Sequence, residues 1–271
     1  MFTVGDYLEE DFPHNRKIIV DALEQYKYYN HIVGLFELDV TDAMVIFERY
    51  KAKGKPLSFT SWIMKCIAEA VKIHPVIHTL RKGRKKTITF EDVDIKCMVE
   101  KDDAEGNKIP IHYIIRKANE KSFLEIQEEI RVAQKYKEEK RRGEKKIKRF
   151  QGNIMMLPKF ARRIVWHSVM TNPMNVKKHL GTIGVSALGM YGKGINGWAI
   201  PRTPHSTQLL LGAIIKKPVV TDDDQIEIRS ILNVTVSFNH DTVDGGPAVR
   251  FVKTLQELTE SAFNLEDLKK E

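Results

Sequence analysis

The chain has 271 residues, 42% of them hydrophobic and 30% charged, with a formal net charge of +8. This composition excludes the disordered, collagen-like and low-complexity classes and fits one large domain or two small ones. The longest stretch without a charged residue, 179–192, is too short to cross a bilayer, and the first ten residues lack the features of a secretory signal. The two cysteines, Cys66 and Cys97, lie in apolar periodic segments, so we expect reduced thiols, a cytoplasmic location and no membrane partner.

The positive charge is concentrated in residues 135–149, which contain nine basic and three acidic residues. Such a run is usually a solvated helix end or loop, and it lacks the alternating aromatic side chains of single-strand binders. We therefore interpret it as solvent-exposed, although it could steer a phosphate-rich ligand. Nucleic acid is the least favoured partner.

The first half of the chain alternates helical and extended patterns. Residues 16–26 have apolar side chains at helical spacing, and 31–40 form a run typical of a strand. Thr41 is positioned to cap a helix through residue 49, and Ser58 to cap a helix that Pro75 ends. Short strands are predicted at 86–90, 94–100 and 109–115, and Ser122 opens a long amphipathic helix.

The second half continues this mixture. Residues 157–170 predict a helix, followed by strands at 182–188, 208–215, 225–228 and 231–238 and a last helix at about 246–260. Helices interspersed with strands, without strict βαβ repetition, predict an α+β sandwich of a mixed sheet flanked by helices. We expect a single domain spanning 1–271, with a basic helical insertion at about 135–178 on its surface.

The most informative segment is 236–246, where a strand pattern ends at His240 and a helix restarts after Asp244. A histidine at a strand end is held by the sheet but open to a cleft, and its neutral imidazole can accept a proton near pH 7. Taken alone, a partly buried structural histidine is the more common role for His240, and a helix N-cap is the more common role for Asp244.

A second segment, 181–192 (GTIGVSALGMYG), places Ser186 between glycines near the end of a strand, where its hydroxyl could donate to an oxyanion. The G-x-S-x-G pattern of serine hydrolases is missing, because Leu188 stands where the second glycine belongs. The sequence also lacks a phosphate-binding P-loop, an H-E-x-x-H pair and a C-x-x-C pair. The remaining histidines show no ligand spacing, so we predict no metal site.

Together these segments resemble the catalytic domain of dihydrolipoamide acyltransferases of 2-oxo acid dehydrogenase complexes and, more distantly, chloramphenicol acetyltransferase. His240 to Gly245 fits the family's H-x-x-x-D-G motif, and 181–192 is similar to its serine-bearing segment, with Ser186 on the serine. Three further segments match in order, at 15–17, 57–75 and 109–126, and 248–255 resembles the family's terminal helix. The resemblance covers about residues 16–260, without 135–178.

The resemblance implies a chloramphenicol acetyltransferase-like fold assembled as a homotrimer or larger homo-oligomer, with an active-site channel between subunits. Coenzyme A or acyl-CoA would enter one end and the acyl acceptor the other. His240 would act as the general base, and Ser186 would hydrogen-bond the oxyanion of the tetrahedral intermediate. Asp244 would pair with Arg16 and support the turn that carries His240. No metal is required, and residues that bind coenzyme A are not identified.

The sequence departs from the family in ways that leave the function open. We find no lipoyl domain, so we expect a stand-alone form whose lipoyl group another chain would supply. Asp241 stands where arginine is usual, and Asn239 where aspartate is usual. A dihydrolipoyl-type thiol is the favoured acceptor, with a hydroxyl or an amine as alternatives. The main rival is a non-catalytic oligomeric scaffold or assembly partner that retains the fold.

Overall fold

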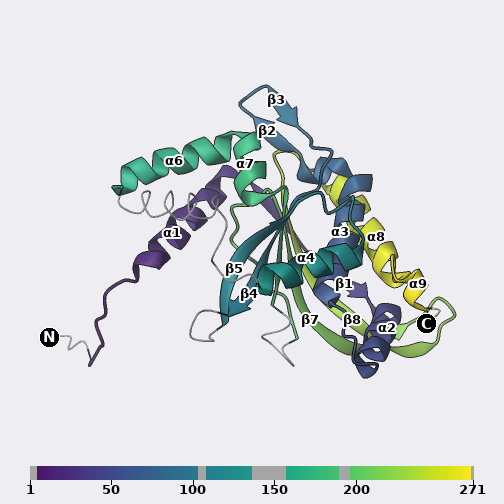
Figure 1. Ribbon diagram of the computed structural model, residues 1–271. Helices are drawn as coiled ribbons and strands as arrows, with labels where there is room; N and C mark the ends of the chain where they lie inside the picture. The colour runs from purple at the N-terminus through teal and green to yellow at the C-terminus, as the bar shows by residue number, and fades with distance from the viewer. Residues whose placement is uncertain (1–4, 103–107, 136–156, 189–195, 270–271) are drawn as a thin grey trace.

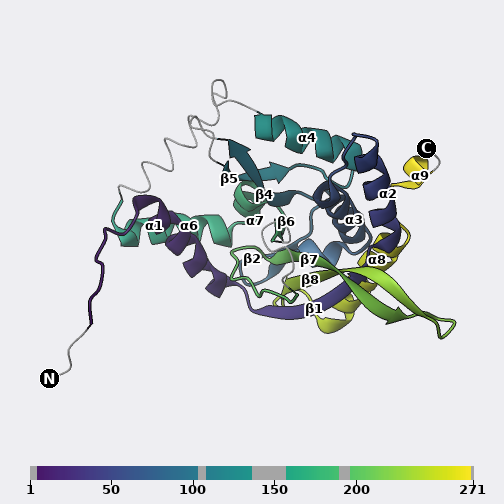
Figure 2. The same cartoon turned by 90° about the horizontal axis from the view of Figure 1, so that it is seen from below.

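A six-stranded mixed sheet organises the computed structural model, which describes residues 5–102, 108–135, 157–188 and 196–269 (Figures 1 and 2). The helical segments are α1 (His14–Leu23), η1 (Glu24–Tyr28), α2 (Thr41–Ala52), α3 (Phe59–Ile73), η2 (Pro75–His78), α4 (Phe123–Lys135), α6 (Lys159–Thr171), α7 (Pro173–Leu180), α8 (Gly245–Glu260) and α9 (Glu266–Lys269). The strands are β1 (His31–Asp39), β2 (Leu80–Lys82), β3 (Lys86–Ile88), β4 (Ile95–Asp102), β5 (Lys108–Ile115), β6 (Ile183–Ala187), β7 (Thr207–Val220) and β8 (Ile226–Asn239).

The strand order in the sheet is β1-β8-β7-β6-β4-β5, and β2 and β3 form a separate hairpin. The central strand β6 runs parallel to both β4 and β7, whereas the outer pairs are antiparallel. The segment that carries Ser186, on β6, and the segment that leads to His240, on β8, therefore belong to one sheet. Only β7 separates the two strands.

The hydrophobic core covers one face of this sheet. Alternate residues of β4, Ile95, Cys97 and Val99, point into it, and α3 packs there against both α4 and α8. Ser58 caps α3 by accepting a hydrogen bond from the Ser61 backbone N–H, at 3.2 Å. The other residues of β4, including Lys96, face the opposite side of the sheet, where a site can be built from polar groups.

A second, smaller apolar cluster joins α6 and α7 to the hairpin. Leu80 of β2 packs there with Met170, Val176 and Leu180. Beyond this cluster, α6 lies beside α1 away from the main core (Figures 1 and 2), and Arg162 binds Asp21 at 2.5 Å between the two helices.

The α+β class, the mixed sheet and most predicted elements are confirmed. Two predictions about elements are wrong. Thr41 is the first residue of α2, not its cap, because its hydroxyl accepts from the Ser230 N–H and donates to Asp39. The strands predicted at 225–228 and 231–238 are one strand, β8, because β7 continues to Val220 and pairs along its length. The strand predicted at 86–90 is confirmed as β3, and it pairs with a further strand, β2, that the sequence did not predict.

The predicted insertion at 135–178 falls partly outside the described residues, which omit 136–156 and therefore most of the basic run. Its described part contains α6 and then a second helix, α7, that the sequence did not predict. Asn172 caps α7 by accepting a hydrogen bond from the Met174 N–H at 3.0 Å. The division of the chain into one domain with an insertion stays a prediction.

Candidate active site

His240 lies on a tight turn between the end of β8 and the start of α8. Its backbone N–H donates to the Asn30 carbonyl at 2.7 Å, which ties the turn to the residue before β1. Asn239 fixes the rest of the turn, because its side-chain oxygen accepts from the Asp241 N–H and its carbonyl accepts from Thr242 and Val243. The His240 side chain is 46% exposed. The backbone is thus held firmly while the imidazole stays accessible to a substrate.

The carboxylates beside His240 have different partners. Asp244 Oδ1 lies 3.6 Å from His240 Nδ1, too far for a hydrogen bond, and its side chain is 86% exposed. Asp244 occupies the N-cap position of α8 but accepts no capping hydrogen bond there. Asp241 instead accepts from Asn30 Nδ2 at 2.8 Å and pairs with Arg81 at 3.2 Å. Of the two acids, only Asp244 lies beside the imidazole.

Arg16 lies on α1 and is exposed. Within the described part of the chain, it forms no ion pair with Asp244. The pairing implied by the family resemblance is therefore not made in this structure, and the role of Arg16 stays a prediction.

Ser186 lies near the end of β6, on the sheet face opposite the core residues Ile183 and Val185. The buried Gln208 donates from Nε2 to Ser186 Oγ at 3.2 Å. Because Gln208 supplies the proton of this bond, the Ser186 hydroxyl keeps its own hydrogen for another acceptor. Gln208 is a partner of Ser186 that the sequence did not identify.

Gly184 makes this arrangement possible. A Cβ atom at Gly184 would lie 2.1 Å from Gln208 Oε1 and 2.9 Å from His205 Cγ, so a larger residue would displace both side chains. A glycine inside a strand often marks such a close approach, and this was the signal that could have indicated a partner for Ser186.

A pocket of about 140 Å³ opens beside Ser186, between the ends of β4 and β6 and the helices α3 and α4. Burial raises the pKa of the Cys97 thiol in its wall to about 12, so this cysteine is a poor nucleophile. The lining residues are Ser58, Thr60, Met64, Cys97, Met98, Val99, Glu100, Ile130, Gln134, Ser186, Ala187 and Leu188.

The sheet face that carries Ser186 is electrostatically unusual. Lys96 pairs in register with Gly184, and burial lowers the pKa of its ammonium to about 8. Burial, reinforced by the charge of Lys96, also lowers the pKa of His205 to about 3, so this imidazole is neutral. The same two causes lower the pKa of His112 on β5. Lys96 and the imidazoles of His205 and His112 therefore lie near the Ser186 strand on this side of the sheet.

His240 and Ser186 do not meet within one chain. Ser186 is level with Leu210 on β7 and Thr235 on β8, two strands across and five residues before His240. At about 3.3 Å per residue and 4.8 Å between strands, their backbones are roughly 19 Å apart. A reaction that uses both residues therefore requires a second copy of the chain.

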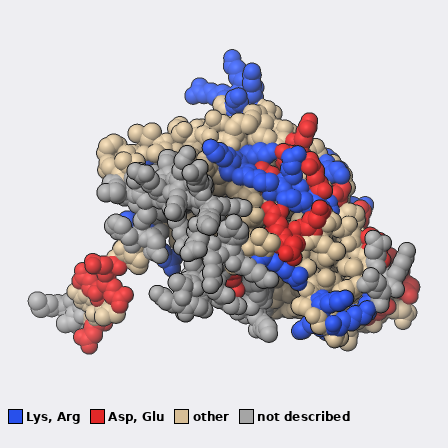
Figure 3. All heavy atoms as spheres, in the orientation of Figure 1, with Lys and Arg blue, Asp and Glu red and all other residues tan. Residues whose placement is uncertain are grey.

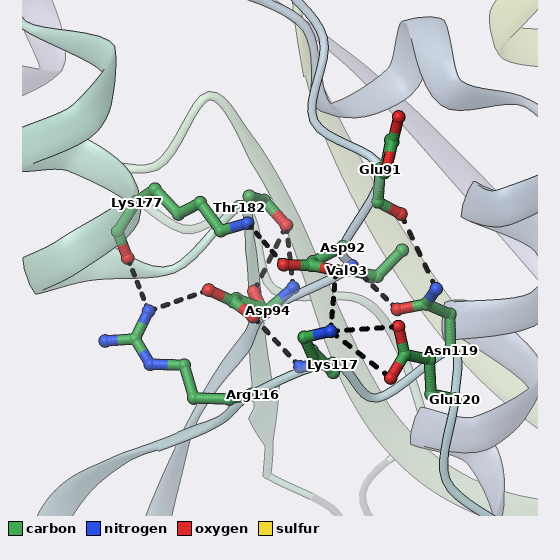
Figure 4. A network of polar contacts seen from close by, with 10 residues as sticks. All are labelled: Glu91, Asp92, Val93, Asp94, Arg116, Lys117, Asn119, Glu120, Lys177 and Thr182. Carbon is green, nitrogen blue, oxygen red and sulfur yellow. Dashed lines mark hydrogen bonds and ion pairs between the residues drawn. The ribbon is translucent and has the colours of Figure 1, made fainter.

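A polar network fixes the strand that carries Ser186 (Figure 4). The buried Asp94 carboxylate accepts from Arg116 Nη1 at 2.7 Å and from the Lys117 N–H at 3.0 Å. Arg116 also donates to the Lys177 and Lys178 carbonyls at the end of α7, and the Asp94 carbonyl accepts from the Thr182 N–H at 2.7 Å. The start of β4, the end of β5 and the α7–β6 junction are thereby held together.

Among the described residues, no His, Cys, Asp and Glu side chains gather in a group that could hold a metal ion. Within the same part of the chain, none of the helices combines the length and the apolar character that a membrane crossing needs.

Several solved structures share this fold. A probable dihydrolipoamide acetyltransferase of Listeria monocytogenes superposes with a TM-score of 0.67 at 21% identity, covering 96% of both chains. The cubic core of a pyruvate dehydrogenase multienzyme complex gives a TM-score of 0.63 at 18% identity, covering 96% of this chain and 97% of that one. Azotobacter vinelandii dihydrolipoamide acetyltransferase gives 0.66 at 18% identity, covering 94% and 92%. That structure addressed the catalytic roles of a serine, a histidine and an asparagine four residues after the histidine.

The fold is thus shared with these catalytic cores, and the predicted fold class is confirmed. The chain belongs to the family described as 2-oxoacid dehydrogenases acyltransferase (catalytic domain), whose model matches residues 5–157 and 171–266.

Two curated relatives illustrate the range of this family. A succinyltransferase component of the 2-oxoglutarate dehydrogenase complex of Staphylococcus saprophyticus is 28% identical over 240 residues, or 86% of this chain and 46% of the relative. A lipoamide acyltransferase component of the branched-chain alpha-keto acid dehydrogenase complex of Bacillus subtilis is 25% identical over 254 residues, or 91% and 50%. The chain spans about half the length of these relatives.

Proposed function

We propose that this chain transfers acyl groups between coenzyme A and a dihydrolipoyl-type thiol. Two side chains carry the proposal. The imidazole of His240 is accessible on a fixed turn, and the hydroxyl of Ser186 keeps its proton for a substrate because Gln208 donates to its oxygen. The names of the relatives, a dihydrolipoyllysine-residue succinyltransferase and a lipoamide acyltransferase, support a lipoyl thiol over a hydroxyl or an amine.

The reaction follows from these two groups. Nδ1 of His240 faces Asp244, which leaves Nε2 to take the proton of the attacking thiol. The thiolate attacks the thioester carbonyl carbon, and Ser186 of a neighbouring copy donates a hydrogen bond to the resulting oxyanion. When the intermediate collapses, the C–S bond to the first thiol breaks, and the departing thiolate recovers the proton from His240. No net proton or electron is consumed.

The proposal includes an oligomer, since the two groups lie roughly 19 Å apart in one chain by strand geometry. We propose a homotrimer or a larger assembly built from it, in keeping with the cubic core found among the structures of similar fold. The acyl carrier would be a lipoyl-bearing protein, and the location the cytoplasm, where Cys66 and Cys97 would stay reduced, as both are buried free thiols.

Thiol release from acetyl-CoA and succinyl-CoA, with dihydrolipoamide as acceptor, tests the activity. His240→Ala should abolish turnover, whereas His167→Ala, an exposed histidine on α6, should leave it unchanged. Ser186→Ala should lower kcat by about 100-fold to 1000-fold. Unchanged turnover in His240→Ala would refute the mechanism, and no turnover with any acyl-CoA would favour the scaffold.

Mixing the two inactive variants tests whether the site lies between copies. After joint unfolding and refolding, a trimer interface should pair an intact His240 with an intact Ser186 in about one quarter of cases, so about 25% of wild-type activity should return. Recovery should not occur when the variants are refolded separately and then combined. An active monomer would contradict the shared site.

A further inference from the structure

The β2–β3 hairpin carries the densest group of basic side chains among the described residues. Arg81, Lys82, Arg84, Lys85 and Lys86 fall within six positions that contain no acid, and all five are exposed. Figure 3 shows a group of Lys and Arg side chains projecting beyond the rest of the surface where Figure 1 places this hairpin. We name these five residues the basic hairpin.

The charge of the basic hairpin is largely unneutralised. Only Arg81 forms an ion pair within the described part of the chain, with Asp241 at 3.2 Å. Lys82 and Lys86 lie directly opposite each other in the two-stranded register, an arrangement of like charges that destabilises a strand pair. An anion bound across the hairpin would remove this repulsion.

The base of the hairpin is fixed to the turn that carries His240. Arg81 pairs with Asp241, the residue after His240, and Thr242 Oγ1 donates to the Thr79 carbonyl at 3.2 Å. Leu80 is buried with residues of α6 and α7, which anchors the first strand. Arg84 lies in the turn at the tip of the hairpin, three residues after Arg81, so their backbones are at most about 10 Å apart. The positive charges therefore lie on a hairpin whose base is bound to the turn that carries the candidate base.

The composition of the hairpin favours the binding of phosphate groups over the stacking of nucleic-acid bases. Residues 80–88 contain no aromatic side chain on which nucleic-acid bases could stack. Neighbouring Phe90 is already covered by Lys177, 4.8 Å from the ring centroid. Flexible lysines and arginines without a stacking platform suit compact, highly charged groups such as phosphates.

We propose that the basic hairpin binds the phosphate groups of coenzyme A and so delivers its thiol end to His240. The proposal rests on the proposed function and adds a site for the nucleotide part of the substrate. Electrostatic attraction between the hairpin and the phosphates raises the rate at which coenzyme A encounters the protein. Salt screens this attraction and so weakens the effect.

The test compares Arg84→Gln/Lys85→Gln/Lys86→Gln with a matched control, Lys51→Gln/Lys55→Gln/Lys216→Gln. The control removes three exposed charges from α2, its following loop and β7, at the opposite end of the molecule from the hairpin (Figure 1). Calorimetric binding is measured for coenzyme A and for pantetheine, which has the same thiol arm without phosphates. Single-stranded RNA and an acidic lipoyl domain serve as competing polyanions.

The hairpin variant should weaken coenzyme A binding about 10-fold, since each exposed ion pair contributes only a few-fold. Pantetheine binding should not change, and the control should bind both ligands as the wild type does. An unchanged affinity for coenzyme A would overturn the proposal, as would equal weakening of both ligands. A loss confined to RNA or to the lipoyl domain would assign the hairpin to that partner instead.

Turnover separates this proposal from the proposed function. If the hairpin variant raises the KM for coenzyme A but not for pantetheine, with kcat unchanged, both stand. If binding depends on the hairpin while wild-type protein transfers no acyl group, only the catalytic proposal fails. If both thiols react in a His240-dependent manner and the hairpin variant has no effect, only the hairpin proposal fails.

Discussion

Replacing Asp94 by alanine should destabilise the protein far more than the same change at Asp92. Both carboxylates are drawn in Figure 4, and both bind basic side chains. The Asp94 side chain is 2% exposed and accepts from Arg116 and the Lys117 N–H, whereas that of Asp92 is 30% exposed and pairs with Lys177 and Lys117. Burial, not the number of partners, distinguishes the two sites.

The magnitudes follow from this difference. Removing a buried, charge-assisted acceptor leaves its donors without a partner, and for two bonds, one to the half-exposed Arg116, the net cost is about 3 kcal/mol. An exposed pair contributes about 1 kcal/mol at most, which is the expected cost of Asp92→Ala. With an unfolding entropy of about 2.1 cal/mol/K per residue, these values correspond to Tm decreases of about 5 °C and 2 °C.

Thermal and urea unfolding of both variants at one protein concentration measures the difference, since oligomerisation makes Tm depend on concentration. Asp94→Asn provides an intermediate case, because its amide oxygen can still accept from the Lys117 N–H while the charge is lost. Equal decreases in Tm for Asp92→Ala and Asp94→Ala would refute the reasoning that the buried carboxylate holds the junction together.

Three further outcomes can be measured. Lys96→Met should raise the free energy of unfolding by about 1–3 kcal/mol at pH 7. The pKa of Lys96 is about 8 in the folded protein and 10.5 ordinarily, so the stability of the wild type rises relative to the variant between these pH values. Urea unfolding at pH 7 and pH 10.5 should therefore show that the stability advantage of the variant disappears at the higher pH. Gly181→Ala should lower Tm by several degrees, roughly 2 kcal/mol, since φ is +72° and the new Cβ would lie 2.7 Å from the Asp94 carbonyl oxygen. Gly184→Ala should displace Gln208 and lower kcat roughly 10-fold in the thiol-release assay; unchanged kinetics would contradict the positioning role.

Local sequence patterns predicted the elements because these depend on short-range chemistry. The capping oxygen of Ser58 and the helical spacing after it predicted the start of α3, and the pairing of Ser122 with Glu125 begins α4 in the same way. The errors occurred where distant residues decide. The Thr41 hydroxyl does not cap the helix because it accepts a hydrogen bond from the N–H of Ser230, 189 positions away. The strand β8 is continuous only because β7 pairs with it.

For the candidate site, the sequence by itself determined the identities that matter: a histidine at a strand end, a serine among glycines, and a motif spacing that placed the chain in its family. Only the tertiary structure decided their relations. It brought Gln208 to Ser186 over Gly184, tied Arg81 to the His240 turn, left Arg16 apart from Asp244, and separated His240 from Ser186. The physical reason is that a residue's type and local backbone preference are properties of neighbouring positions. Its partners, burial and electrostatic environment depend on which distant strands and helices fold against it.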